Sequence, residues 1–314
     1  MKSKTKSILT SAMTVLLITG MAAAAELLGN REILFPEIAA IAAGSLLVPQ
    51  PKWKTDSKHI LAMIAFGAVA GILIVRLLPL PQWMQMSAAF LLASLMLAYS
   101  GTTFAPAISA IVLPVMLGTE SIVYPAAAII LTSLILAMRK LAAHLCAVEP
   151  ISFTPEPLPD RSELADVLLR WCIGSAVIFL ALHTGMRFAA APPLLVAFTE
   201  FRKPHSAAHN RPFATGALLI GCAGCGALLR LSALAMHIPA FPAAGLTALL
   251  VVLIMHRTQL FIPPAAALAI LAYLIPAEAV AVYPLQIACG TIILIALALL
   301  HIEHLKAVKR HANI

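Results

Sequence analysis

The sequence predicts an all-α, polytopic membrane protein with about twelve hydrophobic segments in two parallel six-segment repeats. Of the 314 residues, 61% are hydrophobic and only 11% are charged, and the mean hydropathy is +0.98. Soluble domains carry about 25% charged residues. The apolar runs are long and continuous, and similar motifs recur in both halves. Because backbone polar groups inside a bilayer must be paired within the segment or within a closed barrel, such runs favour helices.

Twelve apolar segments follow one another along the chain. They lie at 7–25, 33–48, 60–78, 83–99, 104–118, 121–142, 167–186, 189–201, 212–234, 240–255, 262–276 and 277–300. The first resembles a secretory signal, but we interpret it as an uncleaved helix because the seventh matches it. Crossing the hydrocarbon core takes about 20 helical residues. The second, fifth, eighth and eleventh segments have only 13 to 16 residues, so these four are the uncertain crossings.

The basic residues predict the sidedness of the chain. If all segments cross and the N-terminus is cytoplasmic, 17 of the 21 Lys and Arg residues fall inside. Only Arg31, Arg76, Arg187 and Arg230 remain outside. Positive charge in short loops favours the cytoplasmic side. One re-entrant segment would reverse every later loop and remove this bias, whereas re-entrant segments in pairs stay open. We expect a multi-pass protein of the cell inner membrane with both termini in the cytoplasm.

Two pairs of motifs indicate the duplication. Residues 104–125 and 262–284 both begin with an apolar residue near proline and end with a glutamate shortly before Tyr-Pro. Residues 67–77 and 221–231 both run from glycine to a late arginine. The predicted organisation is a first repeat over 1–143, a cytoplasmic, acidic and proline-rich linker over 144–166, and a second repeat with a short basic tail over 167–314. Six crossings per repeat insert both copies the same way round.

Two stretches of the second half carry a family resemblance. Residues 192–216, PPLLVAFTEFRKPHSAAHNRPFATG, and 254–268, IMHRTQLFIPPAAAL, resemble motifs of the HPP family of integral membrane proteins. The chain departs from the family at its naming histidine, where Ile262 stands, and Phe104 stands there in the first half. The loop order Asn210-Arg211-Pro212 also differs from the family's. The resemblance implies transport of a small solute, since members are associated with nitrite movement.

Paired prolines are the most specific candidate site. Pro106 and Pro263-Pro264 begin corresponding short segments after polar turns. Proline suits the first helical position, and a helix that starts there directs its positive dipole end and unpaired amides back towards the turn. Short proline-interrupted segments in two halves are typical of transporter sites. The alternative is that these prolines only start well-packed helices. The candidate substrate-binding residues are Thr102, Thr103, Phe104, Pro106, Arg257, Thr258, Ile262, Pro263 and Pro264.

Glu37 is the tenth candidate and the one carboxylate that we place inside a segment. A carboxylate within the membrane indicates function by default, such as proton coupling or contact with a cation. Glu37 also follows a proline, so a first-turn carboxylate at the outer interface explains it equally well.

The leading hypothesis is a secondary transporter or channel-like carrier for a small anion such as nitrite, bound between the two repeats. The alternatives are a non-transporting scaffold or sensor, and a cation- or proton-coupled carrier that uses Glu37. We do not expect an enzyme, because Glu37 stands nearly alone and no nucleotide loop, zinc helix or nucleophile elbow occurs. The expected partners are the lipid bilayer and a small-molecule or ion substrate. We expect no cofactor, no metal site and no nucleic acid, and a homo-oligomer stays open.

Overall fold

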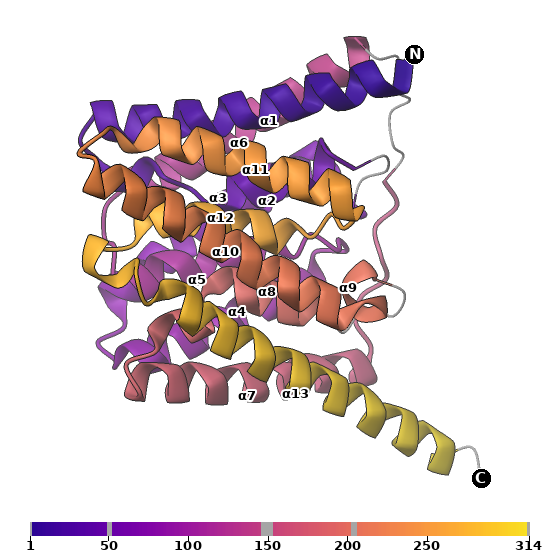
Figure 1. Ribbon diagram of the computed structural model, residues 1–314. Coiled ribbons are helices and arrows are strands. Elements are labelled where there is room, and N and C mark those ends of the chain that lie inside the picture. The colour runs from indigo at the N-terminus through magenta and orange to yellow at the C-terminus, as the bar shows by residue number, and fades with distance from the viewer. Residues whose placement is uncertain (1, 49–51, 146–152, 202–205, 313–314) are drawn as a thin grey trace.

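The computed structural model describes residues 2–48, 52–145, 153–201 and 206–312, and every regular element in these ranges is a helix (Figure 1). The α-helices of the first half are α1 Lys2–Leu27, α2 Glu37–Ser45, α3 Ser57–Leu77, α4 Gln82–Tyr99, α5 Pro106–Leu117 and α6 Val123–Leu145. Those of the second half are α7 Arg161–His183, α8 Pro192–Phe201, α9 Ala207–Asn210, α10 Pro212–Ala235, α11 Ala240–Thr258, α12 Pro263–Leu274 and α13 Tyr283–Ala312. Three 3₁₀ turns complete the set: η1 Arg31–Ile33, η2 Arg187–Ala190 and η3 Ala277–Ala279.

Each of the twelve apolar segments contains a helix. Among the described residues, seven helices are long and apolar enough to cross a bilayer, judged by length and composition. They are α1, α3, α6, α7, α10, α11 and α13. The chain therefore has the helix content of a multi-pass membrane protein. The short segments form helices of 9, 12, 10 and 12 residues in α2, α5, α8 and α12.

The short helices form the core of the bundle and the long helices surround it. Every residue of α8 and α12 is buried, as is almost every residue of α2 and α5. The long helices instead expose large apolar side chains, among them Leu16, Ile130 and Leu228. Extensive exposed apolar surface is unusual for a protein in water. It fits a bundle whose outer faces contact lipid chains.

The connections between helices lie at two opposite ends of the bundle (Figure 1). We call the end with the α1–α2 and α5–α6 connections the first end; there Glu32 accepts a hydrogen bond from Thr119. The second end carries both termini (Figure 1). At this end Lys52 donates to the carbonyl of Phe261, and Lys54 pairs with Glu156. The connecting residues 153–160 contain no helix and pack on this second end. Residues 146–152 of the expected linker, and Arg202, Lys203 and His205, lie outside the described residues.

The segment that contains α5 runs from one end of the bundle to the other, although its helix covers only part of the way. At 1.5 Å per residue, the 12 residues of α5 span about 18 Å, well short of a hydrocarbon core of about 30 Å. Non-helical residues cover the remainder: Thr103 pairs with Lys54 at the second end, and Thr119 bonds Glu32 at the first end. Helix α5 is therefore a partial helix with non-helical residues on both sides.

Arginines at the first end bind backbone carbonyls beyond the core helices. Arg230 is 4% exposed, and its guanidinium donates to the carbonyls of Ala272 and Ile275 at the end of α12. Arg76 donates to the carbonyl of Glu120 after α5. The last carbonyls of a helix lack partners within the helix and carry the negative end of its dipole. Buried Arg230 satisfies carbonyls of this kind at the end of α12, whereas Arg76 and Glu120 are exposed and form their contact at the surface of the first end.

Two aromatic contacts occur once in each half. Tyr124 of α6 donates to the carbonyl of Ala110 at 3.1 Å, and Tyr283 of α13 donates to the carbonyl of Leu268 at 2.8 Å. Each tyrosine also meets a phenylalanine edge to face, with centroids 5.7 and 5.4 Å apart. These are the tyrosines of the two Tyr-Pro motifs. The same side chain therefore fastens the outer helix to the core helix in both halves.

Helices of the two halves are interleaved. Helix α1 packs on α11 and α7 packs on α4, while α2 contacts α12 and α5 contacts α8. Glu26 at the end of α1 accepts hydrogen bonds from the first amides of α11, at Ala240 and Phe241. Glycine permits close approach in the second half: a Cβ on Gly226 of α10 would overlap the carbonyl oxygen of Ala269 in α12. All four core helices are thereby brought against one another at the centre.

Candidate functional site

A small cavity lies where the four core helices meet. Its volume is about 10 Å³, close to the smallest space that holds one water molecule. Each helix contributes two residues, one from its first two positions and one from a turn further on. The lining residues are Glu37 and Ala40 of α2, Pro106 and Ser109 of α5, Pro193 and Val196 of α8, and Pro264 and Ala267 of α12. The cavity therefore faces four helix N-termini.

The cavity lies near the middle of the bundle. From Ser109, helix α5 continues for eight residues to Leu117, about 12 Å towards the first end. From Glu37, helix α2 continues for eight residues to Ser45, about 12 Å towards the second end. A bilayer core of about 30 Å centred on the bundle would place this point at mid-depth. Glu37 therefore lies at about the midpoint of the bundle and is 1% exposed, rather than at one of the two ends.

Glu37 is the one charged side chain that lines the cavity. It is 1% exposed, and its Oε1 accepts a hydrogen bond from the hydroxyl of Ser109. Its Oε2 is buried and has no hydrogen-bond partner among the described residues. Burial of an ionised carboxylate with one unpaired oxygen costs desolvation free energy unless the oxygen binds a proton, a cation or water. Glu37 is therefore the most reactive group of the site.

The two halves contribute unequally to the cavity. Pro106 and Ser109 of α5 have the same spacing as Pro264 and Ala267 of α12. Likewise Glu37 and Ala40 of α2 have the spacing of Pro193 and Val196 in α8. Where the first half supplies a carboxylate and a hydroxyl, the second half supplies proline and alanine. Glu37 and Ser109 are therefore polar at positions where the corresponding residues of the second half are apolar.

The first-turn amides are not free, contrary to our expectation. The amides of Ile108 and Ala265 donate to the carbonyls three residues earlier, both at 3.0 Å. The amide of Leu194 donates in the same way at 2.8 Å, and the prolines have no amide hydrogen. Tightened first turns of this kind satisfy donors that an α-helix would leave open. What remains is the helix dipole, about half a positive charge at each N-terminus.

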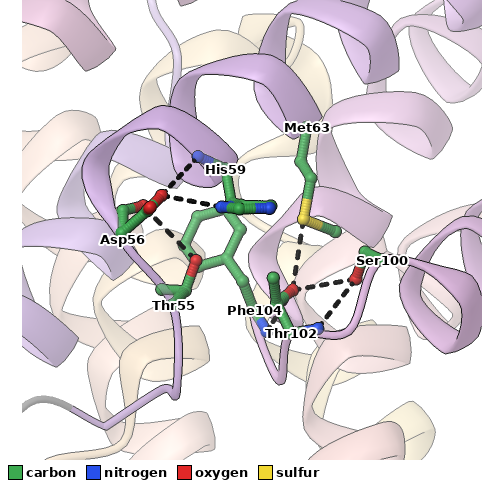
Figure 2. Close-up of polar contacts among 7 residues, drawn as sticks. All are labelled: Thr55, Asp56, His59, Met63, Ser100, Thr102 and Phe104. Carbon is green, nitrogen blue, oxygen red and sulfur yellow. Dashed lines mark hydrogen bonds and ion pairs between the residues drawn. The ribbon is translucent and has the colours of Figure 1, made fainter. Parts of the chain in front are cut away.

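Thr102, Thr103 and Phe104 lie at the second end and do not line the cavity. Figure 2 shows Thr102 and Phe104 with their polar contacts. Thr102 is 4% exposed; it donates to the sulfur of Met63 at 3.3 Å and shares a 2.9 Å hydrogen bond with Ser100. Thr103 pairs with the backbone of Lys54. Phe104 is fully buried, and its amide donates to the Thr102 hydroxyl at 3.4 Å. These residues shape the turn before α5.

The same turn faces the N-terminus of α3. Asp56 caps this helix by accepting from the amide of His59 at 2.8 Å, and a second bond joins the carboxylate to the imidazole (Figure 2). The His59 amide is the main cause that lowers the pKa of Asp56 from its ordinary value. Hydrogen bonds to a carboxylate favour its charged form. This contact stabilises the connection that closes the second end.

Of the candidates in the second half, only Pro264 reaches the cavity. Arg257 and Thr258 are exposed at the second end, where the Thr258 hydroxyl donates to a carbonyl of its own helix. Ile262 and Pro263 are buried at the start of α12 without lining the void. The structure thus brings Glu37, Pro106 and Pro264 together and leaves the other seven apart from them.

Three residues at or near the site were not indicated by the sequence patterns: Ser109, Glu200 and Trp53. Glu200 is 3% exposed, so Glu37 is not the sole carboxylate within a segment. Its Oε1 accepts from the indole N–H of Trp53 at 3.1 Å, and its Oε2 is buried with no partner in the described part of the chain. The available signal was its place inside the apolar run PPLLVAFTEF, at the end of α8. A serine in an apolar helix gives no comparable signal.

Comparisons with known protein families, with curated proteins and with solved structures gave no match. Within the described residues, no three His, Cys, Asp or Glu side chains lie together as a metal site would require. Cys222 and Cys225 of the one Cys-x-x-Cys sequence are free thiols. Functional assignment therefore rests on the cavity and its four helix ends.

Proposed function

We propose that this protein is a proton-coupled secondary carrier of a small anion and that Glu37 is its proton-binding group. The observation that carries the proposal is the position of Glu37. Its carboxylate lies at the meeting point of four helix N-termini, and one of its oxygens is unpaired within the described residues. Helix N-termini stabilise negative charge. The site therefore favours one anion, and the protein's own carboxylate occupies it when Glu37 is ionised.

Protonation of Glu37 couples the proton to the solute. When Glu37 binds a proton, its negative charge disappears and the helix ends become available to an anion from outside. Two unit charges about 4 Å apart repel by about 4 kcal/mol at an effective dielectric constant of 20. This corresponds to an affinity ratio of roughly 10³. Anion and proton therefore bind together and leave together.

The proposed membrane arrangement has twelve segments in two parallel repeats with the second end in the cytoplasm. The paired Tyr124 and Tyr283 contacts and the paired packing of α1 on α11 and α7 on α4 support the repeat. The excess of basic residues expected on the cytoplasmic side supports the orientation. Each short segment then crosses as a partial helix with irregular or 3₁₀ residues beside it, which accounts for the length of the helix.

The proposed substrate class follows from two properties of the cavity: the positive electrostatic potential of the four helix N-termini and the small volume. The 10 Å³ void must enlarge to admit a solute, so a compact anion is the best fit. The resemblance to the HPP family directs the first test to nitrite. Nitrate, formate and chloride complete the panel, because they carry the same single charge.

The test is anion binding and uptake by the purified protein at a series of pH values. Anion affinity of the wild type should fall by up to about 10³ as Glu37 ionises. In Glu37→Gln, which keeps an acceptor for Ser109, affinity should no longer depend on pH. Glu278→Gln removes an exposed carboxylate and should behave as wild type. In vesicles with a trapped pH dye, wild type should acidify the lumen with the anion, and protein-free vesicles measure leakage of the neutral acid.

Two results would reject the proposal. One is the absence of binding and flux for every anion of the panel by protein that is folded in detergent. The other is a pH dependence of anion affinity in Glu37→Gln equal to that of the wild type.

The small cavity favours a second candidate, a non-transporting scaffold or sensor. A void for one water molecule with mostly apolar walls is also what a permanently closed bundle would show. Ser109→Cys, in a chain whose native cysteines are replaced by serine, separates the two functions. A carrier should expose the introduced thiol to reagents added from either side of the membrane in turn. A scaffold should leave this thiol unreactive from both sides.

A further inference from the structure

We propose that Glu200 is a second proton-binding residue, which exchanges the proton of Glu37 with the second end of the bundle. This inference rests on the proposed function, since it extends the path of the proton bound at Glu37. It begins from a feature that the two carboxylates share. Each is at least 97% buried, has one oxygen bonded to a side-chain donor, and has a second oxygen without a partner among the residues that the structure describes.

Helix α8 places Glu200 next to the central cavity. Val196 of this helix lines the cavity beside Glu37. Glu200 follows it by four residues, on the same face of the helix and about 6 Å closer to the second end. Proton transfer between the two carboxylates therefore requires that water enter between them. In the first half the corresponding position of α2 is Gly44, so only α8 offers an acid here.

Trp53 separates Glu200 from the second end. Its indole lies against Gly44, where an added Cβ would overlap the ring, and meets Phe104 edge to face at 5.1 Å. Its N–H holds the Glu200 carboxylate at 3.1 Å. The adjoining Lys52 is fixed by the carbonyl of Phe261 at 3.0 Å. Trp53 thus covers the side of the core helices through which a proton would leave.

Among the described residues, the polar groups around Glu200 leave its second oxygen without a hydrogen-bond partner. On its own side of the bundle, the Ser206 hydroxyl donates to the backbone carbonyl of Glu200, and the His209 imidazole contacts the carbonyl of Phe201. The Lys52 ammonium is directed to a backbone carbonyl. Among these contacts only Trp53 binds the carboxylate itself. The open oxygen is therefore the atom that can receive a proton.

The transfer conserves charge and needs no other reactant. The protonated carboxyl of Glu37 gives its proton to a water molecule, which passes a proton to Oε2 of Glu200. Glu37 becomes a carboxylate, and Glu200 becomes neutral. When Trp53 moves aside, Glu200 releases the proton to water at the second end and regains its charge. Proton uptake from that end follows the same steps in reverse.

The first measurement is the infrared spectrum of the purified full-length protein during a pH jump. Protonated carboxyl groups have their own C=O stretching band, which shifts in heavy water. Wild type should lose two such bands as the pH rises, one of which is absent in Glu37→Gln and the other in Glu200→Gln. Glu200→Asp should keep the second band at an altered frequency. If Glu200→Gln does not fold, the Glu200→Asp spectrum still decides, because an unchanged band would overturn the assignment.

The second measurement is proton-coupled uptake of the anion that the wild type carries. Glu200→Gln should slow uptake at least tenfold and leave the pH dependence of anion affinity as in wild type. If folded Glu200→Gln takes up the anion at the wild-type rate, the role of Glu200 is overturned. If Glu37→Gln binds the anion independently of pH in the same experiments, the proposed function stays in place. Wild-type pH dependence in Glu37→Gln would overturn both. Glu163→Gln, at an exposed position of α7, controls for loss of a carboxylate elsewhere.

Discussion

Replacing Tyr124 by phenylalanine tests how the core helix α5 accommodates its internal proline. Pro114 lies inside α5 and has no amide hydrogen, so the carbonyl of Ala110 lacks its usual helical partner. The Tyr124 hydroxyl supplies the missing donor at 3.1 Å, and the side chain is 1% exposed. Tyr124→Phe should leave this carbonyl buried and unpaired, which costs about 1 to 3 kcal/mol.

The second half provides the matched comparison. Tyr283 donates to the carbonyl of Leu268, but the residue four positions later is Ala272, whose amide pairs with this carbonyl in the α12 helix. Tyr283→Phe should remove one of two hydrogen bonds and cost about 0.5 to 1.5 kcal/mol. The expected difference between the two variants is about 1 kcal/mol, or roughly 2 °C in Tm.

The assay is reversible unfolding in mixed micelles with helicity as the signal, extended to a double-mutant cycle. In a Pro114→Ala background the new amide should pair with Ala110, so the cost of Tyr124→Phe should fall by about 1 kcal/mol. Equal costs for Tyr124→Phe and Tyr283→Phe would contradict the reasoning. So would a cost of Tyr124→Phe that is the same with and without Pro114.

Two further predictions concern helix contacts. Gly226→Ala should destabilise the protein by about 1 to 3 kcal/mol, because the new methyl group overlaps the rigid carbonyl of Ala269. Gly224→Ala in the same helix has open space and should be neutral or stabilise by about 0.5 to 1 kcal/mol. Asp56→Ala should cost about 1 kcal/mol as a lost helix cap. The pKa of Asp56 is lowered in the folded state. Its stabilisation should therefore be present above about pH 4 and be lost as the pH falls through that lowered pKa, while Asp56→Ala lacks this acid-dependent part. Thermal unfolding in detergent measures both, and equal stability of the two glycine variants would contradict the first.

Hydrophobicity predicted the positions of the helices, because the segments that are apolar enough to be removed from water are the ones that form helices here. It could not predict their ends. Helix α7 begins at Arg161 rather than near 167, because Asp160 caps it by accepting from the amide of Glu163. Helix α13 continues through a polar sequence to Ala312. Caps and polar helical turns have no hydropathy signal, so their positions depend on local hydrogen bonds.

The sequence indicated two of the four helix starts that line the cavity, Pro106 and Pro264, and did not indicate which other residues surround it. Prolines at matching places identified the helix ends that meet there, because proline at a helix start is a local rule. The pairing of α2 with α12 and of α5 with α8 is a tertiary property, and Arg257 was misplaced for that reason. Its location in a polar turn near Pro264 says nothing about whether its side chain turns inward.

In the proposed carrier, the unequal contribution of the two halves gives the cavity one acid rather than two. All four helix N-termini add to one field, so both halves are needed to favour an anion at the cavity. A second carboxylate at Pro193, the position equivalent to Glu37, would repel the first and resist ionisation beside it. A single acid avoids this repulsion and leaves one titratable charge beside the four helix N-termini. Glu200 then lies on the other half, one helical turn from the cavity, so the two acids lie one after the other along the bundle axis rather than side by side.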